Sequence, residues 1–178
     1  ALTLHNNILP TPYQAMYKFL TTFTGPLWPH FYVSTYRVSA SLALACVTGV
    51  PLGLLLGRSA RCDRLFAPII YIIYPVPKIV LLPIIFLIFG LGDQSKIFTI
   101  WLVIFFQILV TARDASKSVP QQNIYSMRSL GANNWQIAQH VIFPACLPKI
   151  ITSLRISLGT TIAILFFVES FATTEGLG

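Results

Sequence analysis

A polar segment, residues 113–148, lies between long apolar stretches of the sequence. Apolar residues make up 55% of the chain and charged residues only 10%, and the mean hydropathy is +0.73. In a soluble domain about a quarter of the residues are charged. The composition is therefore typical of an integral membrane protein, in which the polar segment lies outside the lipid and its apolar neighbours are candidate membrane spans.

The polar segment carries its own helix signals. Residues 121–130 can form a helix, and Gly131 supplies the left-handed residue that commonly ends one. Asn133 is a favourable N-cap, and Gln136 can reach back to its backbone in a capping box. These signals predict a helix, a sharp glycine turn and a second helix that starts near residue 134.

Proline residues are expected to end this second helix. Pro144 disfavours helical geometry in the residue before it, which predicts an end near Phe143, and Pro148 suits the first turn of the next long helix. Across both short helices, apolar or small residues recur at three- and four-residue steps: Ile124, Met127, Gly131, Trp135, Ala138 and Ile142. This stripe indicates a partner surface, although a loop helix packed on its own protein or on the membrane would show the same pattern.

Four apolar stretches are expected to cross the membrane: residues 35–57, 65–89, 97–111 and 149–171. The first reaches ~34 Å as a helix, which is enough to cross with some tilt. The second is interrupted by prolines at positions 68, 75, 77 and 83, so a straight helix is not expected. Broken helices are tolerated at membrane depth where other protein or water satisfies the freed backbone groups. We therefore expect the second span to face the interior of an assembly.

Cationic residues indicate the orientation of the spans. Arg58, Arg61 and Arg64 directly follow the first span, which places that loop in the cytoplasm by the positive-inside tendency. Residues 1–34 are expected to form an amphiphilic outer segment with a short interfacial helix near 13–22. We expect one transmembrane domain over residues 1–178, divided into the outer segment, spans one to three (35–112), a cytoplasmic loop (113–148), and span four with an outer turn (149–178).

Other function classes find little support in the sequence. The formal net charge is +7, but the cations flank apolar runs and form no continuous basic block, so a membrane explains them better than nucleic acid does. The three cysteines are scattered and the three histidines lie far apart, which predicts neither a metal site nor a catalytic triad. The sequence also lacks a phosphate-binding loop. We expect no catalytic residue, metal or cofactor in this chain.

Several polar positions within the spans are candidates for a solute pathway. Lys78 is the one basic residue deep in an apolar run, where a charge costs roughly 2.5–3.5 kcal/mol unless it is solvated or paired. It could meet an anion in the pathway, or it could be a structural contact of the broken helix. Glu169 could line an outer gate or be a hydrogen-bonded interfacial carboxylate. The remaining candidates, which could equally make interhelical contacts, are Tyr74, Pro75, Pro77, Thr160 and Thr161.

Residues 129–132, 135–136 and 141–148 together resemble the cytoplasmic EAA loop of importer-type ATP-binding-cassette permeases. In that family the short helix after the glycine docks in a cleft of the ATPase subunit. This chain departs from the family pattern at residues 125–127, where Tyr-Ser-Met replaces the usual Glu-Ala-Ala. The resemblance assigns ATPase coupling to Leu130, Gly131, Ala132, Asn133, Trp135, Gln136, Pro144 and Pro148.

A second set of motifs, residues 49–53, 75–83, 89–97 and 176–178, resembles permeases for nitrate, sulfonates, taurine and related small anions or vitamin precursors. The resemblance implies an all-α polytopic bundle of the type I importer permease kind, with about four spans and a cytoplasmic coupling helix. Permeases of this group usually have one further helix before this region and another after it. The present chain is therefore expected to be a core that lacks both ends.

The same resemblance implies a non-catalytic permease subunit of an ATP-driven importer in the inner (plasma) membrane. Its expected partners are ATPase subunits that bind ATP and Mg, an external or periplasmic solute-binding protein, and a second permease copy in a homodimer. A passive channel or an ion-coupled transporter without an ATPase is the alternative from another class. A membrane scaffold or membrane enzyme is a third and weaker one.

Overall fold

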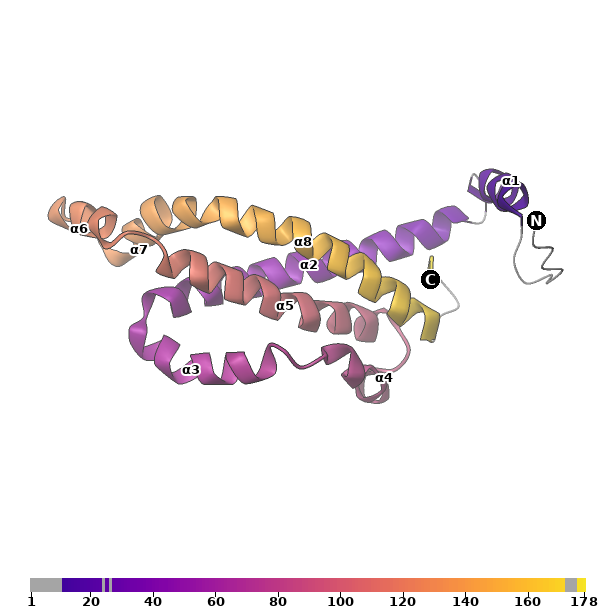
Figure 1. Cartoon of the computed structure of the whole chain (residues 1–178), viewed down its shortest axis with the longest axis horizontal. Coiled ribbons are helices and arrows are strands. Elements are labelled where there is room, and N and C mark those ends of the chain that lie inside the picture. Colours follow the sequence, from indigo (N-terminus) through magenta and orange to yellow (C-terminus); the bar gives the residue numbers. More distant parts are fainter. Residues whose placement is uncertain (1–10, 24, 26, 172–175) are drawn as a thin grey trace, which may run out of the picture.

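The computed structural model describes residues 11–23, 25, 27–171 and 176–178. These ranges contain helices and no strand. This confirms the all-α class. In chain order the elements shown in Figure 1 are α1 (Pro12–Phe23), α2 (Leu27–Arg58), α3 (Ala60–Ile73), the 3-10 helix η1 (Lys78–Leu81), α4 (Leu82–Phe89), α5 (Asp93–Lys117), α6 (Gln121–Ser129), α7 (Asn134–Ile137), the π-helix η2 (Ala138–Ile142) and α8 (Phe143–Phe171).

The expected spans correspond to long apolar helices. Three segments of the described chain are long and apolar enough to cross a membrane by themselves: Leu27–Arg58, Asp93–Lys117 and Asn134–Phe171. A fourth forms only if α3 and the η1–α4 segment, bent by 78° at their break, are taken together. The proline-interrupted second span is thus a broken one, as predicted. The multi-pass membrane class is confirmed.

The first long helix begins earlier than the sequence suggested. α2 starts at Leu27 rather than near residue 35, because Pro29 lies in its first turn, where a missing N–H costs no helical hydrogen bond. Trp28 and Tyr32, aromatic residues of the expected amphiphilic outer segment, therefore lie on the first turns of α2 and are exposed. The helix expected near residues 13–22 is present as α1.

Glycines bring α2 into close contact with α5. A Cβ atom at Gly53 would lie 2.7 Å from the Ala112 Cβ, and one at Gly57 would lie 2.6 Å from the Ser116 Cβ. Such distances are far below van der Waals contact, so the two backbones approach as closely as they do only because α2 lacks side chains there. Small residues at helix contacts are the usual device for packing helices in lipid.

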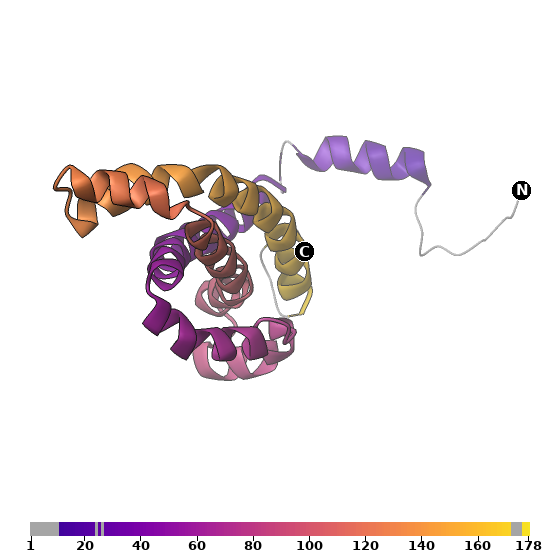
Figure 2. The same ribbon diagram turned by 60° about the vertical axis from the view of Figure 1, so that its left-hand side comes forward.

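α5 is the central helix of the bundle. It packs against α2 and α8, and against η1 and α4 on its remaining side, as Figures 1 and 2 show from two directions. Ile100, Ile104 and Ile108 of α5 are almost fully buried, and they form one core with Ala45 of α2 and Val168 of α8. A second core lies toward α6 and α7 and contains Ala112 and Ala115 of α5. α5 therefore connects the two ends of the molecule.

The expected break at Pro144 is wrong. The helix that starts at Asn134 continues through the π-helical turn η2 into α8 without a stop. In this wide turn the N–H of Phe143 donates to the carbonyl of Ala138, five residues earlier. A π-turn shifts the hydrogen-bond register by one residue, which accommodates Pro144 and its missing donor. Pro148 consequently lies inside α8 rather than in its first turn.

Candidate functional site

The turn between α6 and α7 has the geometry that its sequence predicts. Gly131 has a φ of +78°, a left-handed conformation that favours glycine. Asn133 accepts a hydrogen bond of 2.8 Å from the Gln136 backbone, and the Gln136 side chain accepts one of 2.8 Å from the Asn133 N–H. Both halves of the capping box are therefore formed, and they fix the direction in which α7 leaves the glycine turn.

The apolar stripe predicted across this turn is only partly present. Ile124 and Ile142 are buried, as predicted, but Trp135 is 74% exposed and Ile137, which the stripe omits, is 3% exposed. The prediction extended one helical periodicity across the glycine turn. Because α6 and α7 are separate helices, the turn resets the phase of the second one, and Ile137 takes the inward position.

Two large apolar side chains point outward next to the turn. Leu130 is 82% exposed and Trp135 is 74% exposed, and they flank the turn at the α6–α7 end of the elongated molecule in Figure 1. Exposed aromatic anchors on a rigid local frame are typical of protein interfaces. The sequence motif had already marked both residues. Within the described residues, no ring stacking is seen for Trp135.

Lys78 has a fully satisfied environment inside the broken span. Its ammonium group donates to the carbonyl oxygens of Ile73, Tyr74 and Val76 at 2.9, 2.8 and 3.1 Å. The Phe106 ring of α5 lies 4.9 Å from the same nitrogen. α3 ends at these carbonyls and Pro77 has no N–H to donate, so the lysine supplies hydrogen bonds that a continuing helix would have made. The Ile73 carbonyl also accepts from the Val76 N–H at 3.2 Å. The contacts favour a structural role for Lys78. Tyr74, Pro75 and Pro77, predicted beside it, line the exposed side of the break.

Glu169 lies near the C-terminal end of α8 and is buried. Its carboxylate accepts from Arg37 at 2.6 Å, from the Ser34 hydroxyl at 2.9 and 3.0 Å, and from the Gly178 backbone at 3.0 Å. Arg37 also holds Asp93 at 2.5 Å. The buried carboxylate therefore joins α2, α5 and α8, which fits the structural alternative that the sequence left open.

The two predicted threonines of α8 differ in their surroundings. Thr160 donates to the carbonyl of Ile156 at 3.3 Å. The hydroxyl groups of Thr161 and Ser157 are buried and have no hydrogen-bond partner in the described part of the chain. Among the described residues, no hydrogen bond joins either threonine to Lys78 or to Glu169.

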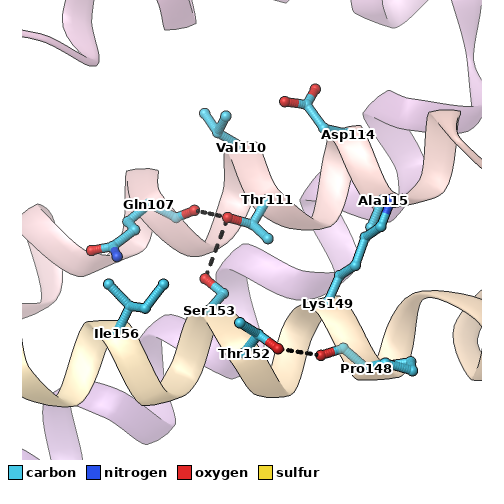
Figure 3. A pocket seen from close by; sticks show the side chains of 10 residues that line it. All are labelled: Gln107, Val110, Thr111, Asp114, Ala115, Pro148, Lys149, Thr152, Ser153 and Ile156. Atoms are coloured by element: carbon cyan, nitrogen blue, oxygen red, sulfur yellow. Dashed lines mark hydrogen bonds between the residues drawn. The ribbon is translucent and has the colours of Figure 1, made fainter.

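A groove between α5 and α8, lined by both apolar and polar side chains, has a volume of about 490 Å³ (Figure 3). The sequence reasoning missed it. Thr111 and Ser153 face each other across it, and their hydroxyl oxygens lie 3.3 Å apart. Lys149 reaches from α8 toward α5 and donates to the Ser118 hydroxyl at 2.8 Å. The sequence feature that could have indicated the groove is the polar pair Gln107 and Thr111, four residues apart in the apolar third span. Only the tertiary structure aligns this pair with α8.

The helical fold with its long apolar segments is that of a multi-pass membrane permease. The glycine turn between α6 and α7, residues 130–133, is called the coupling turn below after the role that the sequence predicts for it. The chain belongs to the family described as binding-protein-dependent transport system inner membrane component, which it matches over residues 49–178.

Several relatives carry transport names. The taurine transport system permease protein TauC of Escherichia coli is 39% identical over 177 residues, which cover 96% of this chain and 64% of TauC. A Bacillus subtilis permease protein named for aliphatic sulfonates transport, SsuC, is 30% identical over 172 residues, covering 96% of this chain and 62% of SsuC. The formylaminopyrimidine transport permease protein ThiX of Halalkalibacterium halodurans is 30% identical over 171 residues, covering 96% and 68%. The chain therefore spans a little under two thirds of the length of TauC and SsuC.

Proposed function

We propose that this chain is the membrane-spanning subunit of an ATP-driven importer for a small anion or related molecule of the taurine, sulfonate, nitrate or vitamin-precursor class. The coupling turn carries this proposal, because its glycine and capping box hold Leu130 and Trp135 outward at one end of the bundle. The names of TauC, SsuC and ThiX support the solute class. ATP and Mg belong to a separate ATPase subunit, and the chain itself is no enzyme.

In the proposed mechanism the ATPase binds the coupling turn, and its movement displaces α8 as a rigid helix. The helix from Asn134 to Phe171 is continuous over 38 residues, so it is roughly 57 Å long at 1.5 Å per residue. Its far end carries Glu169, which is tied to α2 and α5 through Arg37 and Asp93. A displacement of α7 would therefore reach the outer end of the bundle without passing through a flexible loop.

The proposed solute route uses the groove between α5 and α8. Hydroxyl and amide groups of Gln107, Thr111 and Ser153 lie among its apolar side chains and offer hydrogen-bond partners to a solute. The groove is open on one side, so a second permease copy in a homodimer would complete it. Among the pathway residues predicted from sequence, Thr160 and Thr161 continue along α8, whereas Lys78 and Glu169 hold the surrounding helices in place.

Reconstitution of the full-length permease tests this function. The permease is co-expressed with its ATPase, purified from the inner membrane and placed in proteoliposomes. The external binding protein is then added with radiolabelled taurine or with a control amino acid. We expect co-purification of the ATPase and uptake that requires hydrolysable ATP and the binding protein. Uptake by the permease alone, driven only by a solute or ion gradient, would instead establish the channel or ion-coupled alternative.

A further inference from the structure

A basic pocket of about 510 Å³ lies where α2 ends and α3 begins. Its walls include Arg58 from α2, Ala60 and Arg64 from the start of α3, and Lys117 from the end of α5. The positive-inside tendency places this end of the bundle at the cytoplasmic surface of the membrane. The pocket shares no lining residue with the α5–α8 groove. It adjoins the helices of the coupling turn, because Gln121 at the start of α6 lines it and Arg58 also lines a neighbouring cavity with Arg128 and Asn134.

The pocket carries more positive charge than its own carboxylate balances. Asp63 already binds Arg113 and accepts a 2.5 Å ion pair from Lys117. Within the described part of the chain, Arg58 and Arg64 form no ion pair. The start of α3 adds the partial positive charge of a helix N-terminus. Asp63 lines the pocket too, but its carboxylate is already paired with Arg113 and Lys117, so the guanidinium groups of Arg58 and Arg64 and the start of α3 face the cavity without a carboxylate of their own.

The surface next to the pocket is apolar. Along α3, Leu65, Phe66, Ile69 and Ile72 are between 45% and 71% exposed. A ligand with an anionic head and hydrocarbon chains would satisfy both surfaces at once, whereas a free anion would satisfy only the pocket. Guanidinium groups match the oxygens of a phosphate in a bidentate way, and basic pockets at the cytoplasmic ends of spans attract anionic lipids.

We propose that this pocket binds the phosphate headgroup of an anionic phospholipid from the cytoplasmic leaflet, with the acyl chains along α3. The phosphate chemistry is shared with free inorganic phosphate. The apolar face of α3 favours the lipid as its source.

Native mass spectrometry of the full-length permease in detergent tests the site, with titrations of dioleoyl phosphatidylglycerol and dioleoyl phosphatidylcholine. We expect preferential binding of phosphatidylglycerol, and a loss of affinity of about fivefold for each charge removed in Arg58→Gln and Arg64→Gln. Arg61→Gln is the matched control, because Arg61 lies in the first turn of α3 and is exposed but does not line the pocket. Its affinity should stay within about twofold of the parent's.

Three results would overturn the proposal. Equal losses in Arg61→Gln and Arg64→Gln would show diffuse attraction without a site. Unchanged phosphatidylglycerol affinity in the Arg58→Gln, Arg64→Gln double variant would show that the lipid does not bind in this pocket. If that variant also failed to retain the ATPase, the two arginines would instead form a contact with the ATPase. Displacement of phosphatidylglycerol by millimolar inorganic phosphate, with equal binding of both lipids, would assign the pocket to the free ion.

The double variant Arg58→Lys, Arg64→Lys is the control for folding. It keeps both charges and should retain most of the binding, which separates the effect of charge loss from misfolding.

Discussion

Arg37 on α2 and Glu169 on α8 form a buried ion pair of 2.6 Å, although 132 residues separate them in the chain. Arg37 also binds Asp93 at the start of α5, so three helices meet at one guanidinium group. Among these partners Glu169 is buried, whereas Asp93 is half exposed. Loss of Arg37 would therefore leave the Glu169 carboxylate buried without this cation, whereas Asp93 would remain in contact with solvent.

Removal of Arg37 should destabilise the protein strongly. Arg37→Ala leaves Glu169 buried and without its cation, which costs about 3–5 kcal/mol. Thermal unfolding of the full-length permease in detergent should show a clear decrease in Tm. The double variant Arg37→Met, Glu169→Met removes both charges and should recover much of the loss. Additive losses in the double variant would contradict this account of the pair.

A side chain at Gly53 should separate α2 from α5. The Cβ added by Gly53→Ala would lie 2.7 Å from the Ala112 Cβ, and overpacking of this kind costs about 1–3 kcal/mol. Gly159→Ala is the control, because a Cβ at Gly159 in α8 meets nothing within 4 Å. Chemical or thermal unfolding should show a loss for Gly53→Ala and no loss for Gly159→Ala. Equal stability of the two variants would show that the close approach is unimportant.

The glycine turn should control coupling more than folding. Gly131→Val places a β-branched residue at a φ of +78°, which is unfavourable by roughly 1–2 kcal/mol. ATP-driven uptake and ATPase stimulation should fall, while insertion and the helical circular dichroism signal persist. Gly131→Asn is the milder comparison, since asparagine visits this conformation more readily. Full stimulation in the valine variant would disprove the role of the turn.

Trp135 should contribute to assembly without contributing to the fold. Its side chain is 74% exposed, so Trp135→Ala should leave the Tm of the isolated permease nearly unchanged while reducing the amount of co-purifying ATPase. Ile137→Ala is the matched comparison on the same short helix, because Ile137 is 3% exposed and its truncation should cost about 2–5 kcal/mol of stability. The reverse pattern would place Trp135 in the core.

Lys78 should matter for the amount of intact protein and not for transport by each complex. Lys78→Met removes the ammonium group that donates to the carbonyls of Ile73, Tyr74 and Val76, and a hydrogen bond to a charged group contributes about 1.5–3 kcal/mol. Expression and Tm should fall. Uptake in proteoliposomes, normalised to intact complex, should remain close to that of the parent. A strong decrease in normalised anion uptake would contradict this prediction and indicate that Lys78 contacts the solute in the pathway.

Local chemistry allowed the sequence to determine the coupling turn and the span architecture. The positive φ of Gly131, the capping box of Asn133 and Gln136, and the proline-broken second span depend on residues close together in the chain. Such signals act over a few residues and need no knowledge of packing. Hydrophobic runs longer than a soluble domain allows likewise fix the number of spans within narrow limits.

Tertiary structure decided the features that depend on helix phase and on contacts between distant residues. The inward position of Ile137 instead of Trp135 depends on how α7 is directed after the turn, and the uninterrupted path through Pro144 depends on a π-turn that widens the helix. Sequence reasoning left Glu169 and Lys78 between functional and structural roles. Arg37 meets Glu169 only after the bundle has packed, because no local pattern specifies which buried charge faces which across 132 residues. The carbonyls that Lys78 binds are two to five residues away, but the Phe106 ring that covers its ammonium group comes from α5 and depends on packing.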